Sequence, residues 1–310
     1  MPLSYPLRGI ITAMVTPLDE GGRLDPQGTE NLVRHLIHGG VHGIFILGTT
    51  GEAPALTHKQ RAELVRMVCR QVDGRLPVIV GVTDTSYDES VELCQVSADA
   101  GADAVVTAPP YYFSLSQEDL LRHAELLAAD SPLPLFLYNA PLNTHHILQP
   151  ETVCRAAEIE NVVGIKDSGS NMGYFHNLQM LLKPFPDFTF LVGPEELLAE
   201  SVLLGGHGGM AAGSNVFPRL FVDIYHAAER GDAAETARLH ELVMEFGAAV
   251  YGAAAYGENP LRGLKCALSE LGICGDTVTK PLTPYNDAER EVVSRFLEKY
   301  ELGKTMERSA

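Results

Sequence analysis

The sequence predicts a (β/α)₈ barrel with a helical extension at its carboxyl end. Eight short apolar segments, rich in β-branched residues, recur at intervals of roughly 20 to 35 residues, which is the length of one strand and one helix. Eight such units, about 250 residues in all, are typical of this barrel. The eight predicted strands begin at Ile10, Gly43, Pro77, Ala102, Pro134, Val162, Phe188 and Gly208.

Helix-start signals lie between these strands. Thr57 with Gln60 and Ser86 with Glu89 have the spacing of capping boxes, and apolar residues at helical spacing follow each pair. Pro150 stands where a first-turn proline favours a helix. The alternation of strand and helix therefore supports parallel strands joined by helices.

The pattern changes from Phe217 onward. Long helical stretches such as YHAAERGDAAETARLHELVMEFGAAVYG and AEREVVSRFLEKYEL follow, and no clear strand pattern separates them. These residues exceed what the last barrel helix needs. We therefore expect a barrel over residues 1–220 that carries the active site, and helices over 221–310 packed on it.

Composition excludes several functional classes. The chain of 310 residues has 23 basic and 40 acidic residues, a formal charge of −17, and no block rich in Lys or Arg, so no nucleic-acid partner is expected. Its five cysteines are scattered and contain no C-x-x-C pair. The amino terminus lacks a signal-peptide pattern, and no apolar run reaches the roughly 18 residues of a membrane span. We expect a cytoplasmic protein with no membrane partner.

The ends of the predicted strands carry the chemistry, because active sites of such barrels lie at the carboxyl ends of the strands. One lysine, several hydroxyl groups and three carboxylates follow the apolar runs there and converge on one mouth. They are Thr16, the run Gly48-Thr49-Thr50-Gly51-Glu52, Tyr111 and Tyr112, Tyr138 and Asn139, Lys166, and Glu195 and Glu196.

Lys166 ends an apolar strand, VVGIKDSG, where a charged group is costly unless it is paired or neutral. A lysine acts as a nucleophile only as the free amine, which an apolar barrel interior favours by lowering its pKa. The amine then attacks a ketone, and the iminium formed is an electron sink that weakens a bond beta to it. A nearby tyrosine such as Tyr138, held by threonine hydroxyls, suits proton transfer.

The alternative to a chemical role for Lys166 is a structural one, in which it forms an ion pair with Asp167. Adjacent residues of a strand point to opposite faces, so these two side chains do not share a side of the sheet. Tyr138 comes from the end of the preceding strand. Both observations favour a chemical role for Lys166 over a structural one.

Three motifs together resemble the dihydrodipicolinate synthase/N-acetylneuraminate lyase superfamily. They are Gly48-Thr49-Thr50-Gly51-Glu52, Tyr138-Asn139-Ala140-Pro141 and Gly164-Ile165-Lys166-Asp167, in this order and at these separations. Each motif alone is weak, but the three with the barrel pattern are specific. The resemblance covers nearly the whole chain, including the helical extension.

This resemblance implies a class I aldolase without a metal or nucleotide cofactor, in which Lys166 forms a Schiff base with pyruvate. Tyr138 resembles the family's proton-transfer tyrosine, with Thr50 behind it. Thr49 and Thr50 match the residues that hold the keto-acid carboxylate, and Tyr112 resembles a tyrosine that reaches the neighbouring subunit's site. A homodimer or homotetramer is then expected. Further candidates for substrate binding are Gly48 in the first motif, Ser168 directly after the third, and Met210 in the eighth predicted strand.

The same comparison suggests a substrate. The synthase branch carries an arginine soon after YN-x-P, where this chain has Asn143, and sialic acid lyases keep a serine where it has Ala212. The segment GMAAGSN resembles 2-keto-3-deoxygluconate-type aldolases. Glu195 and Glu196 suit a hydroxylated tail, because carboxylates accept several hydroxyl donors, although they also suit a helix amino terminus. His145-His146 either line the acceptor pocket or lie in a surface loop.

We therefore predict a Schiff-base aldolase that forms or cleaves a 2-keto-3-deoxy sugar acid from pyruvate and an aldehyde. Two alternatives within the family stay open: a dihydrodipicolinate synthase in which another residue replaces the arginine, and a keto-sugar-acid dehydratase. A non-catalytic keto-acid sensor is the alternative from another class. The presence of the lysine, the tyrosine and both threonines argues against the sensor, which needs no nucleophile.

Other candidate sites are weaker. His35 and His38 share a predicted helical face, and His42 follows, but no matching carboxylate or cysteine set accompanies them, so solvated or capping roles are favoured over a metal site. The glycines of Gly205–Gly209 lack a G-x-G-x-x-G pattern and a basic clamp. We expect them to allow close packing of a turn and not to hold a phosphate.

Overall fold

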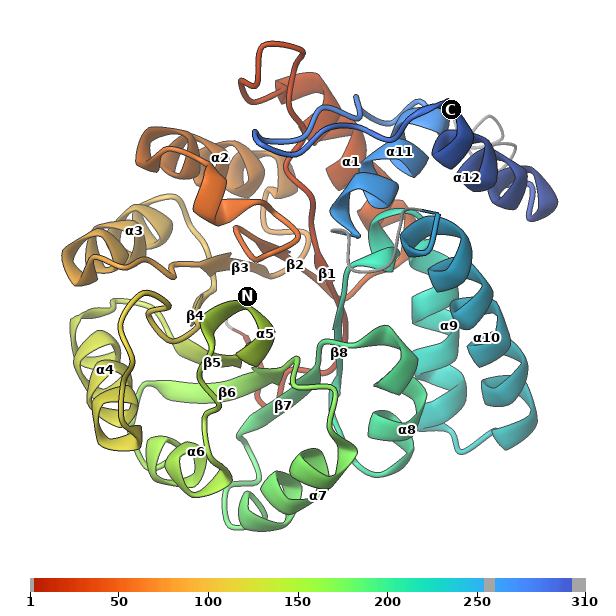
Figure 1. The fold of residues 1–310 in the computed structure, drawn as a ribbon. Helices are drawn as coiled ribbons and strands as arrows, with labels where there is room; N and C mark the ends of the chain where they lie inside the picture. Colours follow the sequence, from red (N-terminus) through yellow and green to blue (C-terminus); the bar gives the residue numbers. More distant parts are fainter. Residues whose placement is uncertain (1–2, 254–259, 303–310) are drawn as a thin grey trace.

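The computed structural model describes residues 3–253 and 260–302, which form a closed barrel of eight parallel strands surrounded by helices (Figure 1). Each strand pairs with the next in the sequence, and β1 pairs with β8, so the sheet has no free edge. The eight strands predicted from the sequence are confirmed. They are β1 Gly9–Ala13, β2 Gly43–Ile46, β3 Val78–Gly81, β4 Ala104–Thr107, β5 Leu135–Asn139, β6 Val162–Asp167, β7 Thr189–Val192 and β8 Gly208–Ala211.

Helices follow the strands around the outside of the barrel, and short helices occupy several of the connecting loops. The α-helices are α1 Pro26–Gly39, α2 His58–Val72, α3 Tyr87–Asp99, α4 Gln117–Asp130, α5 Pro141–Thr144, α6 Pro150–Ala156, α7 Met172–Leu181, α8 Leu198–Leu203, α9 Pro218–Glu229, α10 Ala233–Phe246, α11 Leu261–Glu270 and α12 Asp287–Lys299. The short elements are three 3₁₀ helices, η1 Ala53–Ala55, η2 Glu195–Leu197 and η3 Gly213–Asn215, and the π-helix η4 Gly247–Tyr251.

The apolar side chains divide into two cores, as strands buried on both faces require. The larger core lies between the strands and the surrounding helices. The smaller core fills the barrel interior, where Ile11, Phe45, Phe136 and Met210 pack against one another from different strands. A packed interior leaves no pore, so the chemistry is confined to the ends of the barrel.

The predicted helix starts are largely confirmed. Thr57 and Gln60 form both hydrogen bonds of a capping box at the start of α2. Ser86 accepts a bond from the Glu89 amide, but the Glu89 carboxylate pairs with Nδ1 of His58, at 3.1 Å, and so does not complete a capping box. The Glu89 carboxylate therefore pairs with a side chain of α2 and not with the backbone at the start of its own helix.

The helix α9 packs against β1, α1 and α8, as the last helix of a (β/α)₈ barrel does (Figure 1). A boundary between residues 220 and 221 would cut this helix. We therefore propose that the extension begins with α10 and includes η4, α11 and α12. The long loop between α11 and α12 runs back over the barrel toward α1 and α2, which brings the extension near the loops of the barrel mouth.

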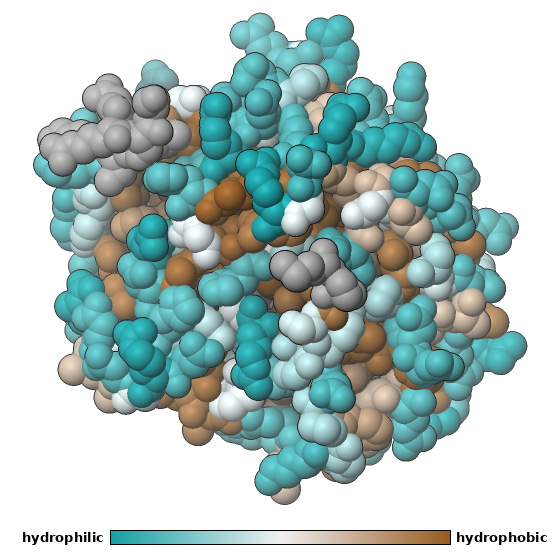
Figure 2. All heavy atoms as spheres, turned by 180° about the vertical axis from the view of Figure 1, so that it is seen from behind, coloured by the Kyte–Doolittle hydropathy of each residue, from teal (hydrophilic) through white to brown (hydrophobic). Residues whose placement is uncertain are grey.

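The face opposite that of Figure 1 is shown in Figure 2, where hydrophilic side chains predominate and smaller hydrophobic areas lie between them. This distribution agrees with a chain that carries many more acidic than basic residues. Among the residues described, no helix combines the length and apolarity needed to cross a membrane.

The capping box of α2 makes a first prediction. Thr57→Ala removes the acceptor for the Gln60 amide, so we expect the free energy of unfolding to fall by about 1 kcal/mol. Urea denaturation of the two proteins measures this difference. An unchanged midpoint would show that the loop and not the cap determines where α2 begins.

Candidate active site

Lys166 and Tyr138 lie side by side at the mouth of the barrel. The register of β5 and β6 pairs Phe136 with Gly164 and Tyr138 with Lys166. Phe136 points into the barrel, and a Cβ at Gly164 would lie 2.6 Å from its ring, so glycine is needed opposite it. Because side chains alternate along a strand, Tyr138 and Lys166 also point inward, one step nearer the carboxyl ends.

The lysine amine lies between two aromatic rings. The Nζ atom of Lys166 is 4.4 Å from the centre of the Tyr138 ring and 5.1 Å from that of Phe45, and the side chain is buried. Asp167 points away: its carboxylate accepts hydrogen bonds from Asn139 Nδ2, at 2.8 Å, and from the amide of Gly169, at 3.0 Å. Within the described residues, no carboxylate lies at ion-pair distance from Lys166.

Asp167 supports the loops beside the site. Burial raises the pKa of its carboxyl group, and the bonds from Asn139 and Gly169 oppose this effect. The Asn139 amide in turn accepts a hydrogen bond from the amide of Leu148, at 3.1 Å. This network fixes the ends of β5 and β6 and hence the relative positions of Tyr138 and Lys166.

The Tyr138 hydroxyl is surrounded by polar groups. Burial alone would raise its pKa, but the charge of Lys166 and hydrogen bonds with Ser168, Thr49 and Lys166 outweigh burial, so the pKa lies below the usual value. The Ser168 hydroxyl lies 3.5 Å from the Tyr138 oxygen. A phenol in this environment gives up and regains its proton more readily than one in water.

The threonine nearest Tyr138 differs from the one predicted to stand behind it. Thr49 lines the cavity and helps to lower the pKa of Tyr138, whereas Thr50 is half-buried outside the lining. The loop that carries both threonines is held by a hydrogen bond, 2.7 Å long, from the Thr16 hydroxyl to the carbonyl of Gly51. Thr49 is therefore the better candidate for a proton relay, and Thr50 for substrate binding alone.

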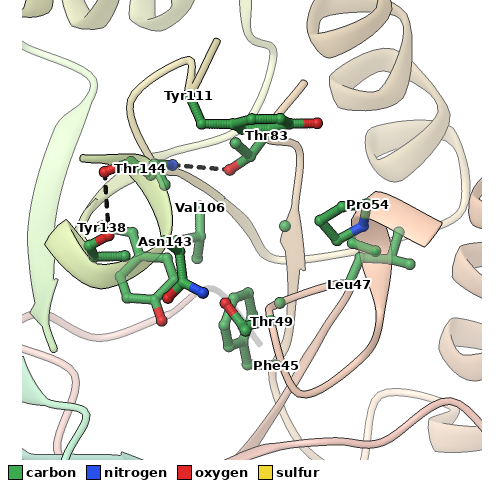
Figure 3. Close-up of a pocket in the computed structure, with 15 residues that line it drawn as sticks. Phe45, Leu47, Thr49, Pro54, Thr83, Val106, Tyr111, Tyr138, Asn143 and Thr144 are labelled. Carbon is green, nitrogen blue, oxygen red and sulfur yellow. Dashed lines mark hydrogen bonds between the residues drawn. The ribbon is translucent and has the colours of Figure 1, made fainter. Parts of the chain in front are cut away.

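A cavity of about 230 Å³ opens beside these residues at the barrel mouth (Figure 3). Its lining is mainly apolar, and the side chains of Tyr138, Asn143 and Thr49 surround one part of it. The hydroxyls of Thr83 and Thr144 point to the protein backbone, since Thr83 accepts a bond from Ala108 and Thr144 donates to Ala140. The full lining is Phe45, Leu47, Gly48, Thr49, Ala53, Pro54, Gly81, Thr83, Val106, Ala108, Tyr111, Tyr138, Ala140, Asn143 and Thr144.

The tyrosine pair after β4 is split between two environments. Tyr111 lines the cavity. Tyr112 is 78% exposed, and its ring packs edge-on against that of Phe113, which is 70% exposed. Within one chain, Tyr111 and not Tyr112 therefore reaches the site.

The predicted glutamates after β7 lie away from the cavity lining. Glu196 is exposed. Glu195 is buried, and its carboxylate accepts hydrogen bonds from the amide of Gly213 and, at 3.0 Å, from the hydroxyl of Tyr251. Burial raises the pKa of Glu195 to about 7, against the effect of these bonds. The carboxylate is thus engaged by η3 and η4, and we expect it to brace them and not to bind a substrate tail.

The remaining candidates occupy structural positions. Met210 lies in the interior core on β8. His146 donates from Nδ1 to the carbonyl of Thr144, at 2.7 Å, and accepts at Nε2 from the amide of Leu115, at 2.9 Å, so it stabilises the loop after β5. His145 is exposed beside it.

The histidines and glycines considered for metal or phosphate sites also have local roles. His42 accepts a hydrogen bond from the amide of Ile10, at 3.1 Å, and His35 interacts with the backbone of η3. A Cβ at Gly208 would lie 2.0 Å from the carbonyl oxygen of Gly9, so this glycine permits the close packing of β8 on β1.

Sequence reasoning missed two features of the site. Phe45 lies against Lys166 from inside the barrel. The sequence does not distinguish it from the other apolar residues of β2. Glu52 forms a buried ion pair with Lys265 of α11. A signal for this pair existed: Lys265 interrupts the apolar face of LRGLKCALSE, and a lysine on such a face needs a partner.

The fold and the site together define a class of protein. A closed parallel barrel with a buried strand-end lysine, and a tyrosine hydroxyl beside it on the preceding strand, is the arrangement of an aldolase that works through a lysine Schiff base.

Comparison with known proteins gives the family. Residues 6–300 match the dihydrodipicolinate synthetase family, and the chain belongs to it. The 4-hydroxy-tetrahydrodipicolinate synthase of Pseudomonas syringae is 36% identical over 285 residues, 92% of this chain and 95% of its own, and that of Kosmotoga olearia is 34% identical over 292 residues, 94% and 97%. The enzyme is thus a carbon–carbon lyase of the class I aldolase type, and its family uses a lysine Schiff base with pyruvate and no metal.

Solved structures agree. A dihydrodipicolinate synthase from Bacteroides thetaiotaomicron has 48% identity and a TM-score of 0.93 over 96% of this chain and 100% of its own. A prophage protein of the same family from Escherichia coli, solved in complex with pyruvate, has 31% identity and a TM-score of 0.90 over 96% and 99%. The predicted family, barrel and Schiff-base chemistry are confirmed.

The buried carboxyl group of Glu195 predicts a specific pH dependence. Its pKa of about 7 exceeds the ordinary value of 4.5, so the folded protein keeps this proton at pH values where the unfolded chain has lost it. This contribution to stability is complete below pH 4.5 and is lost as the pH rises toward 7. The free energy of unfolding should therefore fall by on the order of 3 kcal/mol over this range, and the Glu195→Gln variant should not show this fall.

Urea denaturation at a series of pH values measures this difference. Glu196→Gln is the matched control, because Glu196 is the exposed neighbour. Equal pH dependence in the protein with Glu195 and in the Glu195→Gln variant would refute the assignment.

Proposed function

We propose that Lys166 forms the Schiff base with pyruvate and that Tyr138 moves the protons. The observation that carries this proposal is the register of β5 and β6, which places the Lys166 amine beside the Tyr138 ring and hydroxyl inside a buried site. Asp167 is engaged elsewhere, so the amine has no competing carboxylate from its own strand.

The steps follow from ordinary amine chemistry. The unprotonated amine of Lys166 adds to the keto carbon of pyruvate, and the resulting carbinolamine loses water to give an iminium. Loss of a proton from the methyl carbon gives an enamine, whose carbon attacks the aldehyde carbonyl and forms the new carbon–carbon bond. Tyr138, with its lowered pKa, is the group that carries protons to and from these oxygens. Hydrolysis of the iminium releases the product and restores the amine.

The loop after β2 is the proposed site for the pyruvate carboxylate. Gly48 and Thr49 line the cavity next to Tyr138, and Thr50 follows on the same loop. Backbone amides and threonine hydroxyls are neutral donors, which hold a carboxylate without competing with Lys166 for charge. Ser168, 3.5 Å from the Tyr138 oxygen, completes the polar side of the site.

Two aldehydes are candidates for the second substrate. The names of the curated relatives favour aspartate semialdehyde, the substrate expected of a 4-hydroxy-tetrahydrodipicolinate synthase. They support this alternative better than the sugar acid that we predicted from the sequence.

One observation keeps a polyhydroxy aldehyde as the second candidate. Among the described residues, the cavity lining contains no lysine, arginine or histidine, and Asn143 occupies the position where a cationic clamp is expected in the synthases. A carboxylate on the aldehyde would be more costly to desolvate in such a lining than a hydroxyl group. An amide suits hydroxyl groups because it both donates and accepts.

We also propose that the enzyme is a homodimer or homotetramer. The support is the exposed aromatic pair Tyr112 and Phe113 at the edge of the mouth, since exposed aromatic residues are enriched in interfaces. A second chain that covers Tyr112 would place it near the partner's site, as the family resemblance implies.

The nucleophile is tested by trapping. Borohydride reduction in the presence of pyruvate should add one pyruvate-derived group to the protein, on Lys166, and Lys166→Ala should abolish it because no other described lysine lies beside Tyr138. Mass spectrometry of intact protein and peptides measures the adduct. Tyr138→Phe is the companion variant: it should keep trapping at saturating pyruvate and lose most turnover. An adduct that survives in Lys166→Ala would end the proposal.

The aldehyde is tested by pyruvate consumption with each candidate. Turnover with aspartate semialdehyde would support the synthase, and turnover only with glyceraldehyde would support the sugar-acid aldolase. Asn143→Arg provides the matched variant: if the neutral lining excludes a second carboxylate, the variant should gain activity toward aspartate semialdehyde and lose activity toward glyceraldehyde. An unchanged ratio in this variant would show that Asn143 does not select the aldehyde.

A further inference from the structure

A buried ion pair joins the helical extension to the loop after β2. Lys265 of α11 pairs with Glu52, and the two side chains are 0% and 2% exposed. Each charge has further partners. The Lys265 ammonium donates to the carbonyl of Thr277, at 2.6 Å, and the second oxygen of Glu52 accepts from the amide and the hydroxyl of Thr279, at 2.6 and 2.8 Å. Segments more than 200 residues apart in the sequence therefore meet at Glu52.

The loop that Glu52 ends has an unusual backbone. Leu47, at its start, and Glu52, at its end, both have left-handed conformations, with φ of 57° and 58°. Such conformations are strained for residues other than glycine, and they persist only where the surroundings enforce them.

Close packing holds the start of the loop. A Cβ at Gly81 would lie 2.1 Å from the carbonyl oxygen of Leu47, so β3 approaches the loop as nearly as glycine permits. At the end of the loop, the contacts of Glu52 with Lys265 and Thr279 come from the extension. The barrel thus fixes one end of the loop, and the extension fixes the other.

We propose that Lys265 and Glu52 are positioning residues that set the conformation of residues 48–51 for pyruvate binding. This inference rests on the role proposed above for Thr49 and Thr50. The extension is then part of the active-site machinery, although none of its described residues lines the cavity. Loss of the ion pair should weaken pyruvate binding before it affects the later chemistry.

Stability alone explains this pair poorly. Replacing a buried ion pair with uncharged residues of similar size is often neutral or stabilising, whereas removing one partner is costly because the other charge stays buried and unpaired. Removing both charges together therefore distinguishes a role in positioning from a role in stability, because stability should then change little. The double variant Glu52→Gln with Lys265→Met is the decisive one.

The readout is the pyruvate concentration that gives half-maximal borohydride trapping, which needs no aldehyde. In the double variant we expect this concentration to rise about tenfold or more, with the melting temperature close to that of the parent. Each single variant should lose stability as well, because one buried charge remains. A double variant with parental half-saturation would overturn the inference.

Arg262 and Glu289 provide the matched control. They form an ion pair, 3.3 Å long, between α11 and α12, with side chains 12% and 13% exposed, and Arg262 also donates to the carbonyls of Thr283 and Pro284, so the same helix carries a second pair that joins it to α12 and the segment before α12. Arg262→Met with Glu289→Gln should change the melting temperature without changing half-saturation by pyruvate. An equal shift in the control would also overturn the inference, because it would reflect general loosening of the extension.

Two further variants keep the outcomes distinct. Thr279→Val removes one hydrogen bond to Glu52 without leaving a charge unpaired, and it should raise half-saturation by about two- to fivefold even if the double variant fails to fold. Thr50→Val tests the loop itself. If Thr50→Val weakens pyruvate binding and the variants at Glu52, Lys265 and Thr279 do not, only the inference fails. If none of them weakens it, the proposed carboxylate site fails too.

Discussion

The site depends on one constraint, the register of β5 and β6, which puts the side chains of Tyr138 and Lys166 at the same height inside the barrel. A one-residue shift would turn Lys166 outward and Asp167 inward, because side chains alternate along a strand. Gly164 opposite Phe136, and the bonds among Asn139, Asp167 and Gly169, hold the observed register.

The second constraint is a strained loop held from two sides. The loop after β2 begins and ends with left-handed residues that are not glycine, so it needs support from outside its own sequence. β3 supports Leu47 by close packing, and Lys265 and Thr279 of the extension support Glu52 by charge and hydrogen bonds. The extension therefore contributes to the geometry of the barrel mouth.

Much of this could be predicted from the sequence, because strands buried on both faces and capped helices leave strong local patterns. Lys166 was recognisable as a charge at the end of an apolar run. The partners that come from distant segments were not. Thr49 and not Thr50 faces Tyr138, and Glu195 contacts Gly213 and not the cavity, because loop geometry decides where these side chains point.

The aldehyde, too, has to be inferred from a few side chains and not from similarity over the whole chain. The relatives' names rest on similarity over nearly the whole chain, most of which is the barrel scaffold, and one scaffold can carry different specificities. We propose that selectivity for the aldehyde depends on the few lining side chains that are not assigned to pyruvate, such as Asn143 and Tyr111. The charge of these side chains is therefore a more direct test of the aldehyde than the identity over the whole chain.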